Sequence, residues 1–336
     1  MRLTAVFQVF LAIHVAAFSV MAQQPPPLMQ TADSSSAITN SAIELKTPTG
    51  TLFGTLDLPT TDGPWSVAVI IAGSGPTDRD GNQALFKNNS LKFLGQALAA
   101  HGIAALRYDK RGVGQSSGAG QREHELRFET FVDDAVAWIK LLRQDPRFTH
   151  IGVIGHSEGS LIGILAAEQA GKVEAFVSLD GAGRNIADVL REQLKNNLPA
   201  RYEQSDHILG ELAAGRTVDK VPPELAGLFR ASAQPYLISW LKYDPAREIA
   251  ALDMPILIVQ GSTDLQASQN DAQLLAEANK KARLALVPNM NHVLKHSALT
   301  WKWAQLLDYT SPSPLEPQLI EQLVPFLNDA LAAQKK

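Results

Sequence analysis

Apolar residues along this chain form two alternating patterns, one typical of strands and the other of helices. Short apolar runs predict strands buried on both faces, and they lie at 67–72, 103–108, 151–154 and 175–179. Stretches with apolar residues at helical spacing follow them, at about 91–101, 128–143 and 161–170. Strands that alternate with helices predict an α/β fold, in which helices flank a mostly parallel central sheet.

Two departures from this rhythm refine the prediction. Residues 51–58 alternate between apolar and polar, which predicts one strand of an opening antiparallel hairpin. Residues from about 184 to 248 contain amphipathic helical stretches broken by prolines, and no strand candidate. Strand patterns return at 255–260 and 284–287, and a last helix is expected over about 319–333. We therefore expect the middle block to be a helical lid inserted into the α/β domain.

The N-terminus has the composition of a secretory signal peptide. Residues 3–20 are mostly apolar and follow the single charge of Arg2. Val20 and Ala22 are small residues at the −3 and −1 positions of a cleavage site. We predict a signal peptide, residues 1–22, cut after Ala22, and hence an exported protein, periplasmic or secreted. An uncleaved membrane anchor is the alternative, because the apolar stretch is long for a signal peptide.

Composition sets limits on the rest of the chain. Residues 23–40 are rich in Pro, Gln, Ser and Thr, which predicts a disordered leader before an α/β domain over residues 41–336. The chain has 336 residues, of which 45% are hydrophobic, a formal net charge of −4 and no cysteine. The lack of cysteine excludes a disulfide framework and a cysteine nucleophile. We expect no nucleic-acid partner, because there is no basic run, and no stable membrane insertion after signal cleavage.

The most informative motif is Gly155-His156-Ser157-Glu158-Gly159, which lies between a predicted strand and a predicted helix. This is the setting of a nucleophile elbow, a sharp turn that presents a serine hydroxyl at the carboxyl ends of the strands. The glycines let the turn close against the sheet. The helix behind the serine supplies N–H groups and a positive dipole end. We therefore predict that Ser157 is a catalytic nucleophile; an ordinary glycine-rich turn is the alternative.

A serine nucleophile needs a general base, and the base needs an orienting acid. Among the eight histidines, His292 follows the last predicted strand, on a loop near the C-terminus. Asp264 follows the strand at 255–260 and can accept a hydrogen bond from the His292 ring. Asp180, which ends the strand before, is the rival acid. His296 could form a metal pair with His292, but HVLKH lacks the glutamate of H-E-x-x-H, so we expect no metal.

Stabilising the oxyanion requires two N–H donors. One should be the backbone N–H of Glu158, directly after the nucleophile. The other should come from the glycine-rich loop after the strand at 67–72, where backbone amides can approach a substrate closely. We assign this second donor to the N–H of Ser74, with Gly75 as the alternative.

These motifs together resemble the α/β-hydrolase superfamily over roughly residues 43–333. The pattern is similar to a bacterial esterase branch near the dienelactone-hydrolase-like and serine-aminopeptidase-like members. This resemblance implies ester hydrolysis as the commonest activity. Ala72 stands where many members have a histidine before the oxyanion glycine, and we expect the hole to remain intact. Besides the elbow, the motifs are GSGPTDRDG (73–81), YDKRGVGQS (108–116), GSTD (261–264) and NMNH (289–292).

The predicted function is hydrolysis of a small-molecule ester through a covalent acyl-enzyme on Ser157, with no cofactor or metal. Natural substrate, acyl-chain length and oligomeric state are left open. One alternative is a catalytically silent hydrolase fold that serves as a binding module, which the complete Ser-His-Asp set argues against. A second alternative is an aminopeptidase-type serine exopeptidase, which would need an acidic side chain in the lid to bind a free α-amine. The candidate acids are Glu192, Glu203, Asp206, Glu211 and Asp219.

A set of apolar residues in the predicted lid allows two interpretations. Their helical spacing is typical of a packing face. They could also line a pocket for the acyl group. These residues are Leu225, Leu228, Phe229, Tyr236, Leu237 and Trp240.

Overall fold

The computed structural model describes residues 38–120 and 122–332. The predicted signal peptide and most of the predicted leader lie outside the described residues. The first strand begins at Ile38, three residues before the predicted start of the domain. The strands of the described chain are β1 (Ile38–Thr47), β2 (Gly50–Pro59), β3 (Trp65–Ile71), β4 (Ala104–Tyr108), β5 (Phe148–His156), β6 (Ala175–Leu179), β7 (Ile256–Gly261) and β8 (Ala282–Val287).

All of these strands belong to one sheet in the order β1-β2-β4-β3-β5-β6-β7-β8. β1 and β2 form an antiparallel hairpin, and β2 also pairs antiparallel with β4. The pairings from β4 to β8 are parallel. The predicted mostly parallel sheet is therefore confirmed, together with the antiparallel hairpin at its start. Parallel pairing brings the carboxyl ends of β3, β5, β6 and β7 to one edge of the sheet, where the predicted site residues follow.

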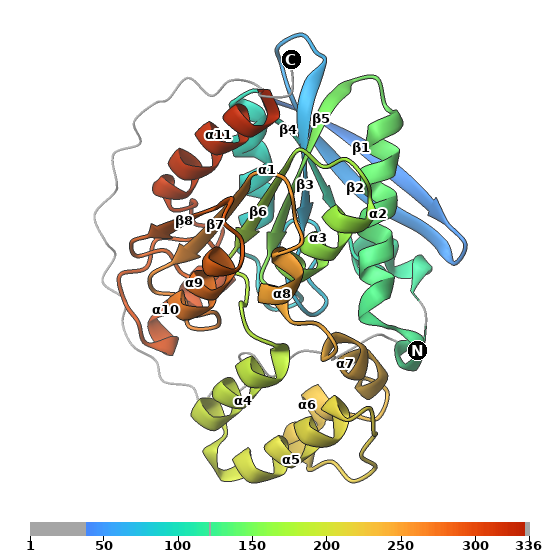
Figure 1. The fold of residues 1–336 in the computed structure, drawn as a ribbon, viewed down its shortest axis with the longest axis vertical. Coiled ribbons are helices and arrows are strands. Elements are labelled where there is room, and N and C mark those ends of the chain that lie inside the picture. Colours follow the sequence, from blue (N-terminus) through green and yellow to red (C-terminus); the bar gives the residue numbers. More distant parts are fainter. Residues whose placement is uncertain (1–37, 121, 333–336) are drawn as a thin grey trace.

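Helices cover both faces of the sheet, as Figure 1 shows. Along β3, alternate residues enter different apolar clusters: Val67, Val69 and Ile71 on one face, Ala68 and Ile70 on the other. The apolar run is continuous because both faces of this strand are buried. The helices packed around the sheet are α1 (Ser90–Ala100), α2 (Phe128–Gln144), α3 (Glu158–Gln169), α9 (Gln269–Ala278) and α11 (Pro317–Ala332), and α10 (Lys302–Thr310) precedes α11.

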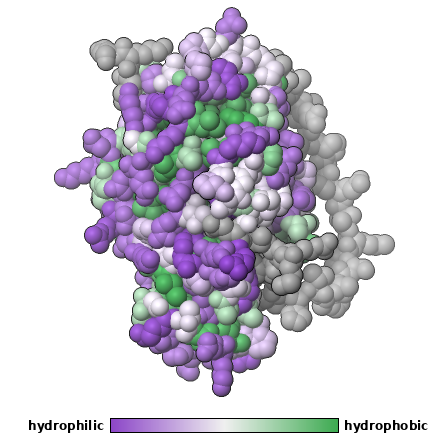
Figure 2. Space-filling view, turned by 90° about the vertical axis from the view of Figure 1, so that its right-hand side faces the viewer, coloured by the Kyte–Doolittle hydropathy of each residue, from purple (hydrophilic) through white to green (hydrophobic). Residues whose placement is uncertain are grey.

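Between β6 and β7 the chain leaves the sheet and forms a helical insertion, which we define as residues 186–249. Its helices are α4 (Ile186–Asn197), α5 (Tyr202–Ala213), α6 (Ala226–Phe229), α7 (Gln234–Trp240) and α8 (Pro245–Ile249). Helices α4 to α7 lie below the carboxyl end of the sheet in Figure 1, and they form the narrower lower lobe in Figure 2. The insertion thus lies at the edge where the site residues are expected.

A search of the described residues finds no helix that is both long enough and apolar enough to cross a membrane.

Candidate active site

Ser157 occupies the sharp turn between β5 and α3, with a left-handed backbone φ of 55°. Such an angle is rare for a residue with a side chain and is associated with strained functional turns. The flanking glycines make the turn possible. A Cβ on Gly155 would lie 2.1 Å from the carbonyl oxygen of Gly159, and one on Gly159 would lie 2.3 Å from the carbonyl oxygen of Ile71. The backbone therefore has no room for side chains at these two positions.

Two hydrogen bonds connect Ser157, His292 and Asp264. The Nε2 atom of His292 lies 3.1 Å from the Oγ atom of Ser157, and its Nδ1 atom lies 2.7 Å from an Asp264 carboxylate oxygen. If the Nδ1–H donates to Asp264, Nε2 is left free to accept the Ser157 proton. The structure thus brings together the three residues predicted from separate loops, which lie up to 135 positions apart.

The Asp264 carboxylate is fully buried and well supplied with donors. It accepts backbone N–H groups from Gln266 at 2.6 Å and Ala267 at 3.1 Å, and the side-chain amide of Gln260 at 3.3 Å. Donors of this kind stabilise an ionised carboxylate away from water. Burial acts to lower the pKa of His292, but the attraction and hydrogen bond of Asp264 outweigh it and raise that pKa above its ordinary value of 6.5.

The two residues predicted to donate to the oxyanion, Ser74 and Glu158, both lie near the nucleophile and line the same pocket. Gly73, directly before Ser74, packs so closely that a Cβ on it would lie 3.1 Å from the Ser157 Cβ. Glu158 is the first residue of α3, so its N–H has no acceptor within the helix. In the described part of the chain, the Ser74 N–H meets no protein acceptor either. Both amides therefore remain available to a developing negative charge.

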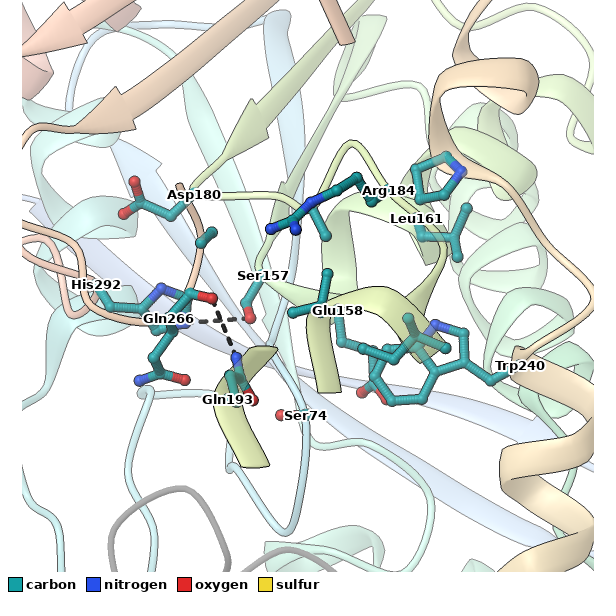
Figure 3. Close-up of a pocket in the computed structure, with 15 residues that line it drawn as sticks. Ser74, Ser157, Glu158, Leu161, Asp180, Arg184, Gln193, Trp240, Gln266 and His292 are labelled. Carbon is teal, nitrogen blue, oxygen red and sulfur yellow. Dashed lines mark hydrogen bonds between the residues drawn. The ribbon is translucent and has the colours of Figure 1, made fainter. Parts of the chain in front are cut away.

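A pocket opens beside Ser157 and His292, and Figure 3 shows the two residues together on one side of it. Ser74 and Glu158 also line this pocket. The helical insertion contributes several further walls, which include Ile186, Val189, Gln193 and Trp240. The pocket is thus formed jointly by the strand-end loops and the insertion.

The six apolar residues predicted in the insertion are all buried, and they divide between two roles. Trp240 lines the pocket beside Ser157, and the Tyr236 hydroxyl donates to the Glu158 carboxylate at 2.6 Å. The other four residues, like these two, belong to the apolar core, so the set is mainly a packing face.

The five acids proposed to bind an α-amine do not line the pocket as the structure describes it. Glu192 pairs with Arg184 at 2.7 Å, Asp206 with Arg191 at 2.6 Å, and Glu211 with Arg216 at 2.7 Å. Glu203 and Asp219 are exposed on the insertion. These side chains therefore give no support to an amine site next to Ser157.

Two residues of the site have contacts that the sequence did not indicate. The His156 ring packs against His292, with ring centroids 4.9 Å apart, and its Nε2 lies 2.7 Å from the His292 carbonyl oxygen. Burial lowers the pKa of His156 to about 3, so this ring stays neutral and donates to that carbonyl. Asp180 is fully buried; one oxygen accepts the Gly261 N–H at 2.8 Å, and the other has no partner among the described residues.

His156, Asp180 and His292 place potential metal ligands within 4.8 Å of one another. Both ring nitrogens of His292 are engaged by Ser157 and Asp264, and the Nε2 of His156 is engaged by a carbonyl. A metal ion would have to replace these hydrogen bonds. His296, which the sequence offered only as an alternative metal partner of His292, bonds Glu316 at 2.6 Å instead. The arrangement therefore fits hydrogen-bonded proton transfer better than metal binding.

The sequence of this chain is similar to a known protein family and to a curated esterase. The family described as serine aminopeptidase, S33, matches residues 89–199, which include Ser157. Esterase EstD of Thermotoga maritima is 25% identical over 248 residues, and the match covers 72% of this chain and 57% of that protein. The chain therefore matches little more than half the length of this curated relative.

Solved structures agree at the level of the fold. Est1E of Butyrivibrio proteoclasticus, bound to ferulic acid, has a TM-score of 0.61 at 18% identity, over 86% of this chain and 99% of that one. A dienelactone hydrolase of Anabaena variabilis has a TM-score of 0.50 at 15% identity, over 88% and 99%. The chain has the α/β-hydrolase fold, and its sequence matches a serine aminopeptidase family and an esterase. Ser157, Asp264 and His292 occur in the chain order expected of a nucleophile, acid and histidine in this fold.

Proposed function

We propose that this α/β hydrolase is a serine esterase that cleaves carboxylic esters of small molecules. The observation that carries the proposal is the continuous hydrogen-bond chain from Ser157 through His292 to the buried Asp264, beside a pocket. The name of EstD, an esterase, and the esterase names of several structural neighbours support the same chemistry.

The reaction follows from the positions of these atoms. The Ser157 Oγ attacks the ester carbonyl carbon while Nε2 of His292 takes its proton, and the N–H groups of Ser74 and Glu158 hold the resulting oxyanion. Collapse of this intermediate breaks the bond to the alkoxy oxygen, which leaves with the proton from His292. Water, deprotonated by the same nitrogen, then attacks the acyl carbon and releases the acid and Ser157.

The helical insertion suits the role of a cover for the bound substrate. Ile186, Val189 and Trp240 present apolar surface to the pocket, and Leu161 of α3 adds to it from the body of the fold. Apolar walls with a few fixed polar groups are typical of small-molecule sites. We therefore propose that the acyl or alcohol part of the ester is apolar and rests against the insertion.

Hydrolysis of p-nitrophenyl acetate, butyrate and octanoate tests this function, with alanine p-nitroanilide as the aminopeptidase substrate. We expect ester cleavage by the wild type, and a loss of at least about a thousandfold in Ser157→Ala, as removal of a triad member implies. Cleavage of the anilide alone would replace the esterase proposal with the exopeptidase alternative. Equal activity in Ser157→Ala would show that the triad is not the catalyst.

A further inference from the structure

Lys110 is a buried lysine that the proposed reaction does not use. It is the second residue after β4, and its side chain is 4% exposed. Its ammonium donates to the Gly73 carbonyl oxygen at 2.5 Å and to the Glu158 carboxylate at 3.3 Å, and it lies 5.6 Å from the centre of the Phe131 ring. Lys110 is not among the residues that line the pocket beside Ser157. Burying a charged group is costly unless it is paired and hydrogen-bonded. These partners therefore hold the ammonium of Lys110 in a defined position.

The bond to Gly73 bears directly on the oxyanion hole. The Gly73 carbonyl and the Ser74 N–H belong to the same peptide unit, which is planar, so fixing the oxygen also fixes the direction of the N–H. A cation at the oxygen further polarises the peptide, which makes its N–H a stronger donor. Lys110 thus acts on the group that we assign as the second oxyanion donor.

The carboxylate of Glu158 completes this arrangement. Its two oxygens are shared between Lys110 and the Tyr236 hydroxyl of α7, at 3.3 and 2.6 Å. Burial and the nearby carboxylate raise the pKa of Tyr236 well above its ordinary value, so the hydroxyl stays protonated and donates. The carboxylate therefore holds the lysine in place and ties the nucleophile elbow to the helical insertion.

We propose that Lys110 is a positioning residue of the oxyanion hole. Its ammonium holds the Gly73–Ser74 peptide so that the Ser74 N–H points at the oxygen on which negative charge develops. This inference rests on the acyl transfer proposed above. It also assigns a role to the Glu158 side chain, which anchors Lys110 rather than contacting the reacting atoms.

The test is Lys110→Met, which removes the ammonium and keeps an unbranched apolar stem. Loss of one oxyanion donor typically costs about 10²- to 10³-fold in kcat, and a misdirected donor should cost about 10- to 100-fold, with KM nearly unchanged. Inhibition by a trifluoromethyl ketone, whose adduct with Ser157 carries an oxyanion, should weaken by the same factor as kcat/KM falls. Lys110→Met/Glu158→Gln, which leaves no unpaired buried carboxylate, should show the same loss.

Arg143→Met is the matched control for stability. It removes a cationic partner of buried Glu174, which directly precedes β6 at the amino end of the sheet, away from Ser157. This variant should keep kcat and inhibitor affinity even if its melting temperature falls. A Lys110→Met protein with unchanged kcat, a loss confined to KM, or an equal loss in Arg143→Met would overturn the inference and leave the esterase proposal standing.

A phosphonate probe separates the two proposals. Ethyl 4-nitrophenyl methylphosphonate labels an activated serine, and its phosphoryl oxygen occupies the same oxyanion position. If the wild type is labelled but cleaves none of the esters tested, the role of Lys110 is tested by the labelling rate instead of kcat. Lys110→Met should then be labelled more slowly than the wild type. If Ser157 is neither labelled nor able to cleave esters, the proposed function fails, and the role of Lys110 fails with it.

Discussion

The loops after β6 and β7 each contain an aspartate whose carboxylate is buried, but the two aspartates have different hydrogen-bond partners. The two strands are parallel neighbours, and each leads into an aspartate whose side chain is buried beside His292. In the loop after β7, Asp264 receives the His292 Nδ1–H, two backbone N–H groups and a side-chain amide. In the loop after β6, Asp180 receives only the Gly261 N–H, and its second oxygen has no partner among the described residues.

This difference shows that a position at a strand end does not by itself decide which acid bonds the histidine. Burial raises the pKa of Asp180 well above its ordinary value, and the negative charge of Asp264 raises it further. The Asp264 side chain is also fully buried, but the turn after it directs two backbone N–H groups at one oxygen, and the His292 ring and the Gln260 amide donate to the other. The comparison favours Asp264 as the carboxylate that orients His292, and it gives Asp180 fewer donors and a raised pKa.

Asp264→Asn should have the largest effect. An asparagine of the same shape cannot hold the His292 ring in the required tautomer, nor stabilise the imidazolium, so kcat/KM for a p-nitrophenyl ester should fall about 10³- to 10⁴-fold. The measurement is steady-state hydrolysis at neutral pH, with thermal unfolding to verify that the variant is folded. A folded variant that keeps more than about a tenth of the wild-type rate, roughly 1.4 kcal/mol in the barrier, would remove Asp264 from the triad.

The sequence was sufficient to predict the parts of the fold that depend on local patterns. Continuous apolar runs located the buried parallel strands, and G-x-S-x-G between a strand and a helix located Ser157. His292 and Asp264 could be named because loops after parallel strands meet at one edge of the sheet. Asp264 was predicted with Asp180 as its rival, and the sequence could not exclude the rival, because the donors that reach each carboxylate depend on the folded turns.

The remaining contacts join residues far apart in the chain, where no pattern indicates a partner. The Lys110 bond to Gly73 spans 37 positions, and the His156 bond to the His292 carbonyl spans 136. The contact between Tyr236 and Glu158 depends on how the helical insertion folds back, which its helical periodicity does not specify. The sequence placed Tyr236 among apolar residues that form either a packing face or an acyl pocket. Neither interpretation used its hydroxyl group.

The pH dependence should show an intermediate effect. His292 must be neutral to take the Ser157 proton, and its pKa is raised above 6.5, so kcat/KM should rise with pH to a midpoint above 6.5. Below that midpoint the rate should fall about tenfold per pH unit. Because the Asp264 charge raises the pKa, the residual activity of Asp264→Asn should have its midpoint at lower pH. A wild-type midpoint below 6.5, or no change in the variant, would show that Asp264 does not act on His292 electrostatically.

Asp180→Asn should have the smallest effect on catalysis. It keeps the shape of the side chain and removes only the titratable group, and asparagine tolerates the left-handed backbone at this position, where φ is 49°. We expect kcat/KM to stay within about fivefold of wild type, a barrier change under roughly 1 kcal/mol.

Stability supplies the sharper measurement for this variant. The folded-state pKa of Asp180 is raised above its ordinary value of 3.8, so the folded protein binds more protons than the unfolded chain. Wild-type stability contributed by this group therefore falls as pH rises from about 4 toward the folded-state pKa. The asparagine in Asp180→Asn does not titrate. The melting temperature of the variant should therefore rise relative to that of the wild type as pH increases across that range. If the difference in melting temperature between Asp180→Asn and wild type does not grow with pH, Asp180 is ionised in the folded protein. If Asp180→Asn loses its activity while Asp264→Asn stays active, the roles of the two carboxylates must be exchanged.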